Sequence, residues 1–282
     1  MLDTRTTDRS LAENARLSSR WERIKQGGSF WATERTEVGS IRRAPILGGL
    51  GPIAMRQTLN ALRNSLKLIF IFAGLAACIA PVSSALGAPV TQEQTLMIIY
   101  VFIAFILPRN LICDFRGDLS RMEIYKTLPV APWRICAGQL VVQTLLGYII
   151  ALTIIASALV FEASITPRVA LILAAFALPL TFLIYAVENT VHLLFPTKLV
   201  AMGRADFEFL GRSIVEFITK TIFIFAAIAA SIAVGLATFR MMGTTLVLPG
   251  LASWLILALI GLLTLVALQF AFRRFEVAET ID

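Results

Sequence analysis

Apolar runs separated by short polar segments fill most of the chain after residue 65. A helix needs about 20 mostly apolar residues to cross a hydrocarbon core about 30 Å thick. Six runs approach or exceed this length, and the second is the weakest because Pro108 and Arg109 interrupt it. The pattern therefore predicts an all-α, polytopic membrane protein with six transmembrane helices. The predicted spans are 66–86, 95–112, 140–161, 169–191, 214–238 and 245–271.

The segment just before the first span has a helical period with two different faces. Met55, Leu59 and Leu62 recur on one face, while Arg56 and Arg63 lie on the opposite face. Such a helix suits a membrane surface, with its apolar side at the acyl boundary and its cationic side toward anionic headgroups. We expect an interfacial amphipathic helix that leads directly into the first span.

Composition leaves room for a single membrane domain. Hydrophobic residues make up 57% of the chain and charged residues 15%, with a mean hydropathy of +0.80. Soluble domains are only about half apolar. We expect a polar cytoplasmic leader over 1–50, a membrane domain over 51–275 and a cytoplasmic tail over 276–282.

The formal charge of +7 reflects topology rather than nucleic-acid binding. Of the 25 Lys and Arg residues, 23 lie in the segments that six spans place on the side of the termini or, like Lys67 and Lys220, just inside a span from that side. Only Arg168 and Arg240 lie on the other side. Short loops rich in Lys and Arg stay in the cytoplasm. We therefore expect a multi-pass protein of the cell (inner) membrane with both termini in the cytoplasm and no nucleic-acid partner.

The longest internal polar segment, residues 108–139, is predicted to contain a short helix. Asp118 is a suitable N-cap, Met122 and Tyr125 recur on one face, and Pro129 ends the helix because the preceding residue avoids helical geometry. The cations expected to remain exposed are Arg116, Arg121 and Lys126.

The run FRGDLSRMEIYKTLPVAPWRICAGQL, residues 115–140, resembles the cytoplasmic loop of ABC exporter permeases. Residues 48–57 and 189–196 resemble segments of one bacterial branch of these exporters, and the similarity covers most of 40–275. The loop positions that match the family pattern are Gly117, Leu119, Leu128, Pro129, Pro132, Gly138 and Gln139.

The resemblance implies that the short helix is a coupling helix that docks on a separate ABC ATPase subunit. An ordinary solvated loop is the alternative. ATP and Mg²⁺ would bind to the partner subunit, and this chain would bind no cofactor. The docking surface would consist of Arg116, Asp118, Arg121, Met122, Tyr125 and Lys126.

Small residues form a stripe on the fifth predicted span, which allows two helix backbones to approach closely. The resemblance implies a dimer, with a second copy or a related permease chain, in which this span lies at the interface. Packing within one chain is the alternative. The stripe consists of Ala226, Ala230, Ala233 and Ala237.

Several kinds of chemistry lack the residues they need. The sequence contains no phosphate loop, so we expect no ATP hydrolysis and no enzymatic activity from this chain. His192 follows Glu188 by four residues, but zinc catalysis needs about three protein ligands, so no metal site is expected. Glu216 and Lys220 have the spacing of a helical ion pair. No charged residue is expected near the middle of a span, which argues against an ion-coupled carrier.

Three functions are consistent with these features. The family resemblance favours the membrane subunit of an ATP-driven exporter of hydrophobic or amphipathic molecules. The first alternative is an ATP-independent secondary transporter or channel. The second is a membrane anchor or assembly protein without transport activity.

Overall fold

The computed structural model describes residues 49–87, 91–107, 115, 118, 122–161, 165–195, 207–242 and 247–275. Over these residues the fold is all-helical and contains no strand, as the sequence predicts. The predicted tail and residues 1–48 of the predicted leader lie outside this part of the chain, as do Arg116 and Arg121.

Four long helices are long and apolar enough to cross a membrane. Their most apolar stretches have mean hydropathies of 2.3, 2.4, 2.4 and 2.6 in chain order. These helices confirm a membrane-embedded, multi-pass protein. They are α6 (Pro132–Phe161), α7 (Pro167–Leu194), α8 (Phe207–Met242) and α9 (Val247–Arg274).

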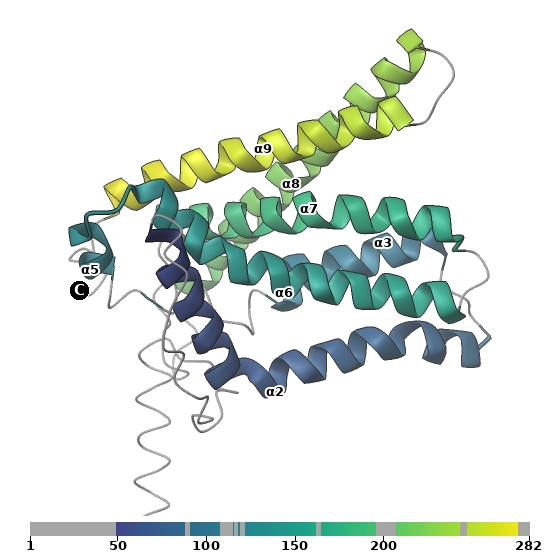
Figure 1. Ribbon diagram of the computed structural model, residues 1–282, viewed down its shortest axis with the longest axis horizontal. Coiled ribbons are helices and arrows are strands. Elements are labelled where there is room, and N and C mark those ends of the chain that lie inside the picture. Colours follow the sequence, from purple (N-terminus) through teal and green to yellow (C-terminus); the bar gives the residue numbers. More distant parts are fainter. Residues whose placement is uncertain are drawn as a thin grey trace, which may run out of the picture.

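The helix α2 (Leu50–Ala85) contains both the predicted amphipathic segment and the first predicted span. Its first half crosses one end of the bundle, and after a bend its second half runs beside α6 (Figure 1). The apolar stretch of the second half, Ile69–Ala85, is shorter than those of the four long helices. That this stretch crosses a membrane stays a prediction.

The first half of α2 buries a different face from the predicted one. Ile53, Gln57 and Ala61, at four-residue intervals, are buried against the protein. A Cβ on Gly138 of α6 would lie 3.0 Å from the Ile53 side chain, so the glycine allows this close approach. Four residues of the predicted faces are half-buried: Met55, Arg56, Leu59 and Leu62. The side chain of Arg63 is not among those that the structure describes.

The second predicted span corresponds to α3 (Gln92–Val101) and the π-helical turn η2 (Phe102–Ile106). Thr91 begins α3 with a capping box, in which its hydroxyl accepts from the Gln94 N–H at 3.3 Å. The structure describes this segment continuously only as far as Leu107, so a full membrane crossing by residues 95–112 stays a prediction.

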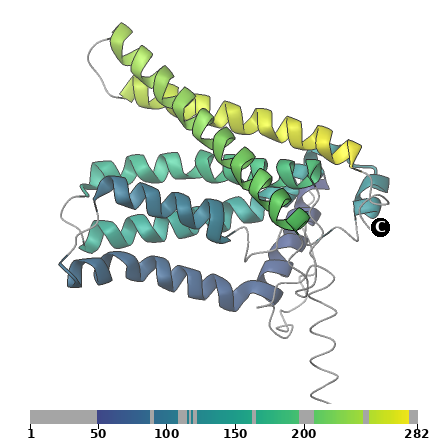
Figure 2. The same cartoon turned by 180° about the vertical axis from the view of Figure 1, so that it is seen from behind.

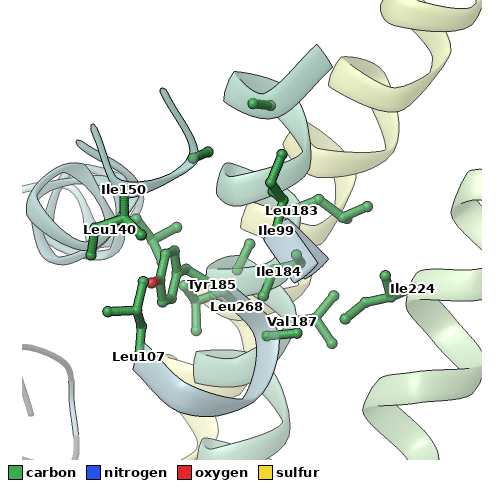
Figure 3. Packing of buried hydrophobic residues seen from close by; sticks show 14 of the residues in the cluster. Ile99, Leu107, Leu140, Ile150, Leu183, Ile184, Tyr185, Val187, Ile224 and Leu268 are labelled. Atoms are coloured by element: carbon green, nitrogen blue, oxygen red, sulfur yellow. The ribbon is translucent and has the colours of Figure 1, made fainter. Parts of the chain in front are cut away.

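The core lies where α6 and α7 meet the other helices. Side chains from α3, α6, α7, α8 and α9 converge there with Leu107, just after η2 (Figure 3). A Cβ on Gly147 of α6 would lie 2.8 Å from the Tyr185 ring of α7, so only glycine fits this approach. The labelled residues are Ile99, Leu107, Leu140, Ile150, Leu183, Ile184, Tyr185, Val187, Ile224 and Leu268.

The helix α8 packs less completely than α6 and α7. It crosses the bundle obliquely, and its last turns extend away from the other helices together with the start of α9 (Figure 2). Large apolar side chains along it are open, including Ile222 at 63% and Met241 at 86% exposure. The predicted small-residue stripe is exposed at all four positions, Ala226, Ala230, Ala233 and Ala237.

Candidate coupling site at one end of the bundle

The short helix α5 (Met122–Thr127) lies at one end of the bundle, near the start of α2 and the end of α9 (Figure 1). We call this end the α5 end. This helix lies within the segment in which the sequence predicts a short helix, and it ends before Pro129. A coupling role for it stays a prediction. The helix α6 begins at Pro132, whose missing N–H and fixed φ suit a first helical position.

Three residues of the predicted docking surface face the interior. Asp118, Met122 and Tyr125 are 1%, 0% and 5% exposed. The prediction that their side chains form an open surface is wrong, because the chain itself covers them. Whether the helix docks on another subunit stays a prediction, and it must involve other side chains.

The carboxylate of Asp118 is the centre of a buried hydrogen-bond network. Its Oδ2 atom accepts from Gln57 Nε2 at 2.7 Å, from the Tyr125 hydroxyl at 2.8 Å and from Gln139 Nε2 at 3.0 Å. Its Oδ1 atom forms an ion pair with Arg56. The Arg56 guanidinium also lies 5.4 Å from the centre of the Tyr125 ring. The network therefore joins α2, α5 and α6.

This network accounts for the burial of a charged group. A carboxylate loses its hydration when it is buried, and that loss is large unless a cation and hydrogen-bond donors replace the water. Arg56 supplies the cation, and two amides and a hydroxyl supply neutral donors. Asp118 thereby connects α5 with α2 and α6. Its expected role as a helix N-cap stays a prediction, since residues 119–121 lie outside the described part of the chain.

Further contacts bind the same segment to the ends of α7 and α9. The Phe115 N–H donates to Asn189 Oδ1 of α7 at 3.4 Å, and the Phe115 ring lies 5.5 Å from that of Phe272 of α9. The Lys126 ammonium donates to the backbone carbonyl of Phe275, just after α9. The segment around α5 is therefore connected to four helices rather than being an ordinary solvated loop.

The outer face of α5 is open in the structure. Ile124 is 59% exposed and Leu128, just after the helix, is 38% exposed. Glu123, Lys126 and Thr127 are exposed beside them. Two apolar side chains flanked by charges form a surface that a protein partner can cover. We call Glu123, Ile124, Thr127 and Leu128 the outer face.

A second charged pair lies within the helix bundle. The Lys220 ammonium of α8 forms an ion pair with the Glu188 carboxylate of α7, and the side chains are 8% and 3% exposed. The helical spacing predicts Glu216, on the same helix, as the partner of Lys220. It does not predict Glu188, which is 32 positions away. No periodic pattern links residues that far apart on different helices.

Other buried polar residues of the described chain lie on α6 and α7. His192, on α7 one turn after Glu188, is 2% exposed. Among the described residues no group of three His, Cys, Asp or Glu side chains could hold a metal ion. Gln143 of α6 and Asn189 of α7 are hydrogen bonded at 3.0 Å, which continues the polar contacts from the α5 end into the bundle.

A comparison of the chain with protein-family models, curated proteins and solved structures finds no match. The fold and the contacts of the chain itself are therefore the basis for the proposals below.

Proposed function

We propose that the chain is the transmembrane subunit of an ATP-driven ABC exporter and that a separate ATPase subunit docks on the outer face of α5. The observation that carries the proposal is the fixed position of α5. Its inner face is connected to α2 and α6 through Asp118 and to α9 through Lys126, while its outer face is open. Movement of a docked subunit would therefore reach the membrane helices directly.

The proposed topology has six crossings with the α5 end in the cytoplasm. Of the 25 Lys and Arg residues, 23 then lie on that side or just inside a span from it, which is the bias typical of cytoplasmic segments. In this arrangement α2 and α3 with η2 provide the first two crossings. ATP and Mg²⁺ bind to the partner subunit, because this sequence lacks a phosphate loop.

The proposed complex contains a second membrane chain, either another copy or a related permease. The exposed stripe around Ala230 on α8 supports this part of the proposal, because small side chains permit close packing of helices in lipid. A shallow, open apolar depression lies where α6 meets Ala77 of α2, and its lining includes Ile149 and Ser157.

A carrier driven by an ion gradient is the second candidate, and the Glu188–Lys220 pair favours it. Ionisable groups buried in a membrane bundle often belong to ion or proton pathways. Transport by the purified chain in liposomes, driven by a proton or sodium gradient without ATP, would support this candidate and contradict the exporter proposal.

Affinity purification from native membranes tests the exporter proposal. The tagged chain should retain a polypeptide with a phosphate loop and an ABC signature, together with ATP hydrolysis. Ile124→Asp should remove both, because an acid replaces an open apolar contact. Leu86→Asp is the matched control, since Leu86 is 77% exposed after the last residue of α2, at the opposite end of the bundle. No such ATPase with the parent chain, or equal loss in both variants, would contradict the proposal.

A further inference from the structure

The junction of α7, α8 and η2 contains a backbone carbonyl with an unusual partner. Ala104 lies in the π-helical turn η2, in which helical hydrogen bonds join residues five positions apart. The Lys220 ammonium of α8 lies 3.1 Å from the Ala104 oxygen and donates to it. A side chain from another helix thus supplies a donor to this carbonyl.

The same ammonium is paired with the Glu188 carboxylate, so one group connects three helical segments. Lys220 and Glu188 are both buried. Buried charges are stable while they neutralise each other, and separating them without solvent is very unfavourable. A contact of this kind is either closed or fully open, which is the behaviour of a switch with two positions.

The position of the junction along α8 gives it mechanical importance. Lys220, Ile224 and Ala227 form the buried side of the helix on successive turns. Further along, the Ala230 stripe is exposed and α8 runs away from the bundle (Figure 2). Along its described length α8 also packs on α9, and the charged junction adds a buried polar contact that joins it to α7 and η2.

We propose that Lys220, Glu188 and the Ala104 carbonyl form a polar latch that holds α8 against α7 and η2. When the latch opens, α8 changes its angle to the bundle. The far ends of α8 and α9 then move relative to α6. The inference does not depend on an ATPase partner, because it rests only on the contacts between these helices.

Distance measurements between spin labels test the latch. Labels at Val160 on α6 and Met241 on α8 occupy exposed positions, at 74% and 86%, near the end opposite α5. The protein, with Cys78, Cys113 and Cys136 replaced by Ala, is placed in lipid nanodiscs for pulsed electron paramagnetic resonance. The otherwise unchanged protein should show one main distance, and Lys220→Met and Glu188→Gln should each add a second population.

A double variant keeps the test decisive even where a single variant fails to fold. E188L/K220M leaves no buried charge unpaired, and apolar replacement of a buried ion pair is often tolerated. It should fold with parental helicity yet show the second distance population. Glu123→Gln on α5 is the matched control and should keep the main distance. An unchanged distance in folded E188L/K220M would overturn the latch.

Discussion

A single carboxylate organises the α5 end. Asp118 is buried, and four side chains from α2, α5 and α6 donate hydrogen bonds to it. Bonds to a charged acceptor are stronger than neutral ones, and the low dielectric of a buried site strengthens them further. The position of α5 therefore depends strongly on this residue.

Asp118→Asn should lower the free energy of unfolding by about 1.5–3 kcal/mol, the range for hydrogen bonds to charged groups. The amide has nearly the same shape, but its NH₂ group faces donors and Arg56 loses its counter-charge. Thermal unfolding in detergent, followed by circular dichroism, measures the change. Glu123→Gln, on the outer face of α5, should stay within about 0.5 kcal/mol of the parent. Equal stability of both variants would show that the network contributes nothing.

Sequence patterns predicted that residues 115–128 matter but assigned several of them the wrong role. The helical period placed Met122 and Tyr125 on one face correctly. It could not show that this face packs inward, because the partners of Asp118 are distant in sequence: Arg56 lies 62 positions away and Gln139 lies 21 away. Local spacing defines the faces of a helix, whereas the covering elements come from tertiary structure.

At the scale of elements, we expect the inner face of α5 to contribute to stability and its outer face to binding. Met122 is fully buried, whereas Ile124 is 59% exposed. Met122→Ala should destabilise the protein by about 2–5 kcal/mol, because it leaves a cavity in the core. Ile124→Ala should leave stability within about 0.5 kcal/mol but weaken binding of the proposed ATPase. Unfolding and co-purification of both variants measure the two effects, and a reversed order would contradict the assignment of faces.

The contact between α6 and α7 depends on a missing side chain. Gly147→Val should reduce the free energy of unfolding by about 1–3 kcal/mol, because the added atoms overlap the buried Tyr185 ring. Gly74→Ala in α2 is the control, since a Cβ there meets no atom within 4 Å. Denaturant titration in detergent compares them. Similar losses in both variants would mean that glycine matters here for reasons other than packing.

The long helices were predicted well because a run of apolar residues is a local property. The spans expected at 140–161 and 214–238 lie within α6 (Pro132–Phe161) and α8 (Phe207–Met242). The helices are longer than the apolar runs because helical hydrogen bonds continue beyond the hydrocarbon region. The Glu188–Lys220 pair was not predictable, since it depends on which helices are neighbours.

At the scale of the whole molecule, the charge distribution and the contacts at the α5 end support the same proposed orientation, with the α5 end in the cytoplasm. The partition of Lys and Arg favours a cytoplasmic α5 end. The structure adds that α5 is bound to α2 and α6 through Asp118 and to α9 through Lys126, and leaves an apolar outer face. A soluble ATPase on that face would contact the bundle where its helices are connected to each other.

Site-specific photo-crosslinking in intact cells tests this central proposal most directly. A photoreactive amino acid at Ile124 should form an adduct with a polypeptide that contains a phosphate loop, identified by mass spectrometry. The same group at Leu86 should not. An ATPase adduct at Ile124 alone is the predicted result, and the absence of any ATPase adduct at Ile124, with the chain expressed and inserted normally, would contradict it.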